Sequence, residues 1–223
     1  MSTAHMRPSE IERTSLSIIS RELDGMGIVL PEEQKPLVLR VIHATADFDY
    51  ASNLVFTENA VRKGIAALAG GADIVTDTNM AKAGISKNGL AGLGGGVFCY
   101  MADPEIAERA RLEETTRAAV SMRHAVKKNP GAVFAVGNAP TALLELERQL
   151  ETGFRPALII GVPVGFVNVL EAKERIISAC ERFRVPAIVA RGRKGGSSVA
   201  AAIANALIYS AADMLEPERR GWN

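Results

Sequence analysis

One of the chain's three histidines lies in a sequence context suited to proton transfer. His43 follows an apolar run and precedes two short polar residues, Thr45 and Asp47. Imidazole exchanges its proton near neutral pH, and a nearby hydroxyl or carboxylate can orient the ring. His43 is therefore the candidate acid or base of this sequence. The alternative, which position alone favours, is a core histidine whose ring is satisfied by a backbone carbonyl.

Two glycine-containing segments supply candidate anion-binding groups. The segment RGRKGGSS combines a glycine pair with three cationic side chains, Arg191, Arg193 and Lys194. The segment GNAPTAL has Gly137 for a tight turn and Asn138 as a helix cap, which predicts free backbone amides at a helix start. Cations and free amides of this kind bind carboxylates or phosphates. Ordinary turn chemistry remains the alternative for each segment taken alone.

No segment has the spacing of a nucleotide-binding loop. The lysine of RGRKGGSS precedes its glycines, so the spacing of a phosphate loop is absent. The segment GLGGG, residues 92–96, has the composition of a dinucleotide fingerprint, but it enters a predicted strand instead of leaving one. Cys99 and Cys180 give neither a disulfide framework nor a metal-ligand spacing, and we expect both to be reduced.

Helical patterns in the first part of the chain must position His43. A helix is predicted after Pro8, with Ser15 the hydroxyl in an otherwise apolar stripe, and a second from about residue 31 to His43. Thr57 is expected to be the N-cap of a third helix. Residues 1–7 are expected to form a mobile tail.

From residue 72 onward, short apolar runs alternate with helical patterns. Strands are predicted at 72–76, 96–101, 132–136, 157–161 and 186–190. Helices are predicted at 104–129, as one or two, and at 139–152, 170–183 and 197–212. This alternation is typical of a doubly wound α/β fold, a parallel five-stranded sheet covered on both faces, with the first helices packed onto it. A single domain spanning 1–223 is expected, since no linker interrupts the pattern.

The predicted fold brings the candidate residues together. Ligands of such sheets bind beyond the carboxyl ends of the strands. Four of the five strands run there into distinctive segments, TDTNM with Asp77, GNAPTAL with Thr141, GVPVGF, and RGRKGGSS. Because these segments share one edge of the sheet, a ligand site there is favoured over four unrelated turns.

Composition excludes several classes of protein. Lysine plus arginine (26) nearly balance aspartate plus glutamate (25), and a formal charge of +1 disfavours a nucleic-acid partner. The longest uncharged run, 156–170, is too short and too broken by glycine and proline to span a membrane. The start of the chain is too polar for a signal peptide, so we expect a cytoplasmic protein.

The ordered motifs resemble one enzyme family. RVIHATADFDYA, TDTNM, GNAPTAL, GVPVGFV and RGRKGGS are similar, in order and spacing, to the precorrin-8X methylmutases of corrin biosynthesis, including the cobalt-precorrin-8 enzymes. The likeness runs from about Ile11 to about Leu207. It implies a flavodoxin-like fold, a homodimer with a shared active site, and methyl migration from C-11 to C-12 of a corrinoid. Where family members often read GFVGAxESKE, this chain has Asn168 and Ala172, which puts a polar contact from that helix start in question.

The resemblance also assigns residues. It implies that His43 is the catalytic acid or base and that Ser15 and Arg117 contact the substrate. Further substrate-binding residues are expected within the matching motifs and strand-end segments, namely Arg40, Thr45, Asp77, Asn138, Thr141, Arg191, Arg193 and Lys194. A methyl shift within one molecule needs no redox cofactor, nucleotide or protein-bound metal.

Two other functions use the same features. A non-catalytic tetrapyrrole carrier would need the same loops, but it would not need His43. A sugar-phosphate or nucleotide enzyme would rest on fold analogy alone. The motifs DFDYA and TDTNM favour the cobalt-dependent branch of the family.

Overall fold

The computed structural model describes residues 7–57 and 59–221 of the chain. The expected tail, residues 1–7, lies almost wholly outside the described residues. The helices are α1 (Pro8–Gly25), α2 (Lys35–Thr45), α3 (Tyr50–Asn53), α4 (Ala60–Ala69), α5 (Asn79–Gly84), α6 (Lys87–Gly92), α7 (Pro104–Leu112), α8 (Arg117–Lys128), α9 (Pro140–Glu151), α10 (Val169–Phe183), α11 (Ser197–Ala211) and the 3-10 turn η1 (Pro217–Arg220). The strands are β1 (Leu54–Phe56), β2 (Ile74–Thr76), β3 (Val97–Phe98), β4 (Val133–Val136), β5 (Leu158–Gly161) and β6 (Ala187–Ala190).

The strands form one mostly parallel sheet in the order β1-β6-β5-β4-β2-β3. The five predicted strands are all present, and β2, β3, β4, β5 and β6 run parallel. The prediction of five strands is wrong in one respect, because β1 adds a sixth strand antiparallel to β6, with Leu54 opposite Ala190. The chain reaches β1 from α2 and α3 at the carboxyl end of β6, so it can pair with β6 only in the antiparallel sense.

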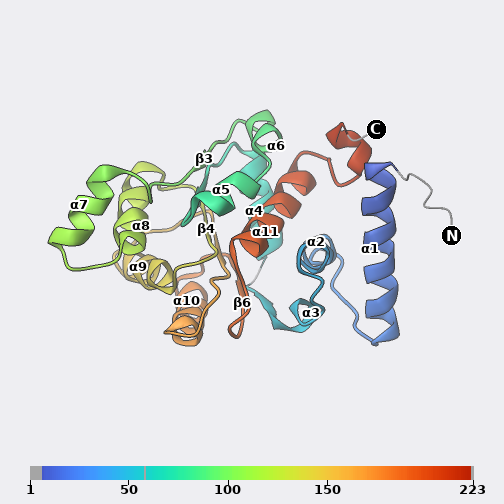
Figure 1. The fold of residues 1–223 in the computed structure, drawn as a ribbon, viewed down its shortest axis with the longest axis horizontal. Helices are drawn as coiled ribbons and strands as arrows, with labels where there is room; N and C mark the ends of the chain where they lie inside the picture. Colours follow the sequence, from blue (N-terminus) through green and yellow to red (C-terminus); the bar gives the residue numbers. More distant parts are fainter. Residues whose placement is uncertain (1–6, 58, 222–223) are drawn as a thin grey trace.

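Helices cover both faces of the sheet (Figure 1). One face packs on α2, α4 and α11, and the other on α8, α9 and α10. Successive strand residues point to opposite faces. Ile74 therefore joins the first core and Val75 the second. Strands β2, β4, β5 and β6 are buried at every residue, and Thr76 is the only polar residue in them.

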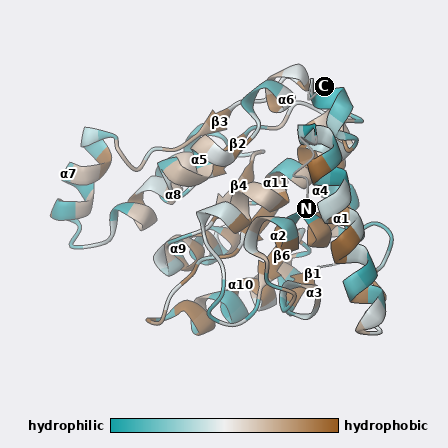
Figure 2. Cartoon of the chain, turned by 45° about the vertical axis from the view of Figure 1, so that its right-hand side comes forward, coloured by the Kyte–Doolittle hydropathy of each residue, from teal (hydrophilic) through white to brown (hydrophobic). Residues whose placement is uncertain are grey.

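Helix α11 is the central element of the first face. Its small and apolar residues are buried along nearly its whole length, and it packs against α2, α4 and α5. Helix α1 lies outside α2, at the end of the molecule far from α7 (Figures 1 and 2). Only part of the predicted apolar stripe of α1 is buried. Ile19 of that stripe is buried together with Leu23, whereas Ile11 and Ile18 are 53% and 40% exposed.

One expected cap has another role. Thr57 does not cap α4, whose N-cap is Asn59. The Thr57 hydroxyl instead accepts the Ala187 N–H at 2.8 Å and donates to the Val185 carbonyl at 3.4 Å. It therefore fastens the end of β1 to the start of β6.

A buried carboxylate joins α1, α2 and the end of the chain. Glu12 Oε1 accepts hydrogen bonds from Arg40 at 2.7 Å and from Arg220 at 2.6 Å. Both guanidinium groups also lie over the ring of Tyr209, at 4.9 and 4.6 Å from its centroid. Burial by itself raises the pKa of Glu12, but the two arginines outweigh burial and hold that pKa below its ordinary value of 4.5.

Removing this charge should destabilise the fold. We expect Glu12→Gln to lower the free energy of unfolding by about 3 kcal/mol near neutral pH, because the buried ion pairs of Glu12 with Arg40 and Arg220 are lost. A carboxyl group whose pKa is lowered by folding stabilises above its unfolded pKa and loses that contribution as pH falls. The difference from the wild type, measured by chemical denaturation, should therefore shrink below pH 4.5. Glu22→Gln, on the exposed side of α1, is the control and should change little.

Candidate active site

The carboxyl ends of the parallel strands gather the segments that the sequence singled out. The segments after β2, β4, β5 and β6 leave this edge, and α3 meets it where the Arg191 N–H donates to the Asn53 carbonyl at 2.8 Å. The end of α2, with His43, is thereby attached to the same edge. This is the edge at which ligands of open α/β sheets bind.

His43 and Ser15 meet across α1 and α2. Ser15 Oγ lies 2.8 Å from His43 Nδ1, within hydrogen-bond distance. The His43 side chain is exposed, so the histidine is not the core residue that its position favoured. With Nδ1 engaged by the hydroxyl, Nε2 is the ring nitrogen that can reach a ligand.

The contact between the two helices is repeated one turn earlier. Glu12 precedes Ser15 by three residues, and Arg40 precedes His43 by three. The ion pair of Glu12 with Arg40 therefore holds the helices in the register that brings Ser15 to His43. The guanidinium of Arg40, which was expected to bind substrate, is turned inward in this structure against Glu12 and Tyr209.

The segment after His43 is tied to the segment after β6. The Thr45 hydroxyl donates to the Val41 carbonyl at 2.8 Å and accepts the Asp47 N–H at 3.3 Å, next to Ala46, whose left-handed conformation ends α2. Lys194 Nζ then pairs with Asp47 at 2.7 Å and with Asp49 at 2.6 Å. The hydrogen bond from Lys194 lowers the pKa of the Asp47 carboxyl despite its desolvation.

The three cations after β6 have different partners. Arg191 pairs with both carboxylate oxygens of Glu174, at 3.1 and 3.3 Å. Lys194 is held by the two aspartates just described. Arg193 lies over the ring of Phe166, 5.6 Å from its centroid, and among the described residues no carboxylate lies within ion-pair distance of it. Arg193 is therefore the cation most available to an incoming anion.

The amides at the start of α9 are already occupied. Asp77, fully buried after β2, accepts the N–H groups of Gly137, Asn138 and Ala139 at 2.8–2.9 Å. The prediction of free amides in this segment is therefore wrong, and Asp77 itself is sealed from ligand. Burial raises the pKa of Asp77, while the three N–H donors oppose that rise. The carboxylate locks two neighbouring strand ends together.

Three expected ligand contacts lie along the same edge but nearer α8. Asn138 is exposed, and the Thr141 hydroxyl accepts a hydrogen bond from Thr116 at 2.9 Å. Thr116 caps α8, and Arg117 follows it with an exposed side chain. A hollow of about 550 Å³ beside Arg117 is lined by residues of α7 and α8. Helices α8 and α2 lie toward opposite ends of the molecule, so one chain does not bring Arg117 to His43 (Figure 1).

Sequence reasoning missed one buried charge of this edge. Lys173 in α10 is 1% exposed, and its ammonium donates to the carbonyls of Gly192 and Lys194. Desolvation lowers the pKa of Lys173 to about 8. The signal was present in the sequence, because Lys173 falls in the apolar stripe of α10 with Val169, Ile176 and Cys180.

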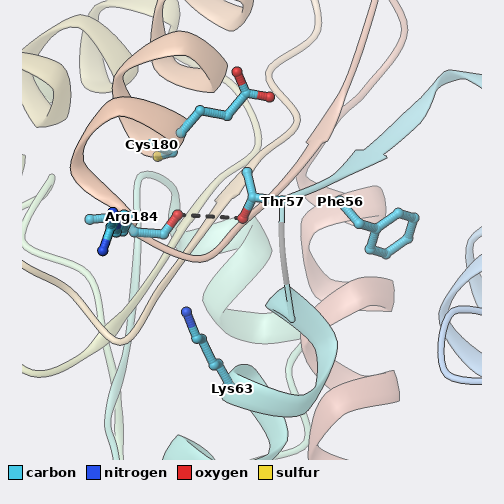
Figure 3. A pocket seen from close by; sticks show the side chains of 7 residues that line it. Phe56, Thr57, Lys63, Cys180 and Arg184 are labelled. Carbon is cyan, nitrogen blue, oxygen red and sulfur yellow. Dashed lines mark hydrogen bonds between the residues drawn. The ribbon is translucent and has the colours of Figure 1, made fainter.

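A cavity of about 520 Å³ lies away from these residues (Figure 3). It is lined by Thr57, Lys63 and Arg184, among others, beside the hydrogen bond from Thr57 to the Val185 carbonyl. Val185 precedes β6, so this cavity opens at the amino ends of the parallel strands. It is therefore separate from the edge that carries His43.

The described residues contain neither a metal-binding cluster nor a membrane-spanning helix. Within 7–57 and 59–221, no cluster of three or more histidine, cysteine or acidic side chains could hold a metal ion. No helix in that part of the chain has both the length and the apolar character needed to cross a membrane.

Comparison with known proteins identifies the family. The family model described as precorrin-8X methylmutase matches residues 10–210. The chain belongs to the precorrin-8X methylmutase family. Its likeness to the family therefore spans α1 to α11 and includes every element of the candidate site. As a member, it is an isomerase of cobalamin biosynthesis.

Individual relatives are similar over most of their length. The cobalt-precorrin-8 methylmutase of Priestia megaterium is 41% identical over 203 residues, covering 91% of this chain and 88% of the relative. The precorrin-8X methylmutase of Pseudomonas aeruginosa is 39% identical over 198 residues, covering 88% and 93%. The crystal structure of the Thermus thermophilus precorrin-8X methylmutase superposes with a TM-score of 0.81 at 41% identity, covering 91% of this chain and 98% of that one.

The two departures from the usual methylmutase motif have structural explanations. Asn168, where family members often have glycine, takes a φ of 57° as the N-cap of α10. Asparagine tolerates this left-handed conformation better than most residues. Ala172, in place of serine, is 1% exposed and packs in the second core. The departure at Ala172 therefore removes no side chain from the surface of the site.

Asp77 offers a test of how the methylmutase edge is held. Asp77→Asn should lower the free energy of unfolding by roughly 2 kcal/mol, because the amide cannot accept all three N–H donors that the carboxylate satisfies. Denaturant titration measures this change. Asp24→Asn, at an exposed position of α1, serves as the control. A change no larger than that of the control would contradict the role given to Asp77.

Proposed function

We propose that this methylmutase moves a methyl group from C-11 to C-12 of precorrin-8X or of its cobalt counterpart, with His43 as the acid or base. The observation that carries the proposal is the contact of Ser15 Oγ with His43 Nδ1 at 2.8 Å. This contact orients an exposed imidazole at the sheet edge where ligands of such folds bind. It also leaves Nε2 free for the substrate.

The reaction needs one proton donor and a macrocycle that is held firmly in a reactive geometry. In the isomerisation, the bond from C-11 to the methyl carbon breaks and a bond from C-12 to that carbon forms, so the atoms balance within one molecule. His43 protonates the ring system or one of its nitrogens as the methyl group moves, and the rearranged chromophore then returns one proton to His43, so no net proton is consumed. Positioned acid catalysis of this kind contributes ~10²- to 10⁴-fold. Holding the macrocycle in a reactive geometry supplies much of the remainder.

The site offers both kinds of surface that a corrinoid needs. Its substrate is a broad apolar macrocycle fringed with carboxylates, and apolar area with a few polar groups suits such a ligand. Phe166 and Val167, after β5, are 84% and 76% exposed. Beside them, the guanidinium of Arg193 lies over the Phe166 ring and supplies a cation for a carboxylate. The cobalt-dependent branch is favoured by DFDYA, whose two aspartates hold Lys194 at this edge.

We further infer a homodimer in which each site uses both chains. Arg117 and His43 are expected at one substrate, yet their helices lie toward opposite ends of a single chain (Figure 1). The face of α1 that carries Ser15 also bears the exposed Ile11 and Ile18. An apolar face beside a catalytic residue suits coverage by a second copy of the chain.

The role of His43 can be separated from folding and from ligand binding. His43→Ala should keep its fold and bind the corrinoid product about as well as the wild type, while turnover falls by ~10²-fold or more. Turnover is followed by absorption, and product binding by titration. His124→Ala, whose ring packs against Tyr100 far from α2, is the control. Turnover within about tenfold of the wild type would refute proton transfer by His43 and would fit a carrier.

The shared site can be tested by mixing inactive variants. After subunit exchange, His43→Ala and Arg117→Ala should together regain part of the wild-type activity, because each mixed dimer contains one intact site. The matched control mixes His43→Ala with Ser15→Ala. These two residues touch within one chain, so no mixed dimer regains an intact pair. Absence of recovery in the first mixture, with exchange demonstrated, would rule out sharing of these residues between chains.

A further inference from the structure

The segment after β6 has backbone groups that regular structure does not satisfy. Residues 191–196 lie between β6 and α11 without helix or strand geometry, and Gly192 and Gly196 have φ values of 79° and 137°. The carbonyls of Gly192 and Lys194 turn inward, where a buried acceptor without a partner would be costly. Lys173 Nζ supplies both hydrogen bonds, each at 2.8 Å.

The same segment is fitted closely to the segment after β5. The Gly196 N–H donates to the Val162 carbonyl at 2.9 Å. A Cβ atom on Gly195 would lie 2.1 Å from that carbonyl oxygen, so only glycine fits at this position. The inward side of residues 191–196 is therefore fixed by Lys173 and Val162. Its outward side presents Arg193 and Lys194.

Burying a lysine to satisfy two carbonyls costs the desolvation free energy of its ammonium group. Lys173 is 1% exposed, and among the described residues no carboxylate lies within ion-pair distance of its ammonium. Desolvation disfavours such a charge. Replacing a buried charged residue by an apolar residue of similar volume often leaves the folded protein at least as stable. The stability of the fold therefore does not explain why a lysine occupies position 173. Its two hydrogen bonds, which hold residues 191–196 in one conformation, do explain it.

We propose that Lys173 is a positioning residue that fixes residues 191–196 and so aims Arg193 and Lys194 at the carboxylates of the ligand. Lys194 extends this arrangement to α2, because its ammonium reaches Asp47 and Asp49 just beyond His43. The assignment of carboxylates as the ligand rests on the proposed function. The effect of Lys173 on the shape of the segment does not.

Limited trypsin digestion tests the effect on shape without any substrate. Arg191, Arg193 and Lys194 are trypsin sites within the segment. Lys173→Met, which keeps a long side chain and removes the charge, should speed cleavage at these sites by about fivefold or more at pH 7, because the open segment is a better substrate. Mass spectrometry identifies the cut sites. Lys127→Met, at an exposed position of α8, is the matched control and should leave their cleavage unchanged.

Steady-state kinetics tests the effect on the ligand. Lys173→Met should raise KM for the corrinoid about tenfold and leave kcat within about threefold, since binding groups are displaced while His43 is kept. Unchanged cleavage together with unchanged KM would overturn the proposal. If Lys173→Met does not fold, Lys173→Gln, which retains an N–H donor, is expected to show the same changes at smaller size. A wild type without methylmutase turnover would refute the proposed function instead, and the digestion would still decide the role of Lys173.

Discussion

The buried carboxylate of Glu12 is the interaction on which the position of His43 depends. It lies between Arg40 and Arg220, and it therefore joins α1, α2 and the end of the chain at one point. Neither helix belongs to the sheet or its connections. This charge cluster therefore acts together with the packing of α2 on α11 and the hydrogen bond from Arg191 to α3 to hold Ser15 and His43 in place. One helical turn further on, Ser15 meets His43. A shift of register between α1 and α2 would separate them.

Two other buried charges organise the sheet edge by binding backbone instead of side chains. Asp77 takes three N–H groups after β4, and Lys173 gives two hydrogen bonds to carbonyls after β6. An anion thus satisfies donors and a cation satisfies acceptors in segments that lack regular structure. Because a half-satisfied buried charge is strongly unfavourable, each one allows few conformations of its segment. The edge is consequently shaped before a ligand arrives.

The sequence predicted the architecture better than the site. Apolar runs located β2, β4, β5 and β6 nearly to the residue, since strands buried on both faces are almost wholly apolar. The sequence did not predict β1. Its three residues pair with β6 because α3, which directly precedes them, ends beside that strand. Among site residues, the roles of Ser15 and His43 followed from family likeness, but their contact with each other was not predicted. The inward roles of Arg40, Asp77 and Lys173 depend on which side of an element faces the core, and local pattern did not disclose their buried partners.

The pairing of the cations suggests how the proposed site discriminates among anions. Arg191 is engaged by Glu174 and Lys194 by two aspartates, whereas Arg193 rests on the face of Phe166. A single small anion gains only Arg193 and must compete with the protein's own carboxylates for the others. A polycarboxylate macrocycle can engage several cations at once while its apolar ring covers Phe166, so its binding energy accumulates over contacts that a small anion cannot combine. Internal ion pairs at the edge therefore favour a large, multiply charged ligand over phosphate.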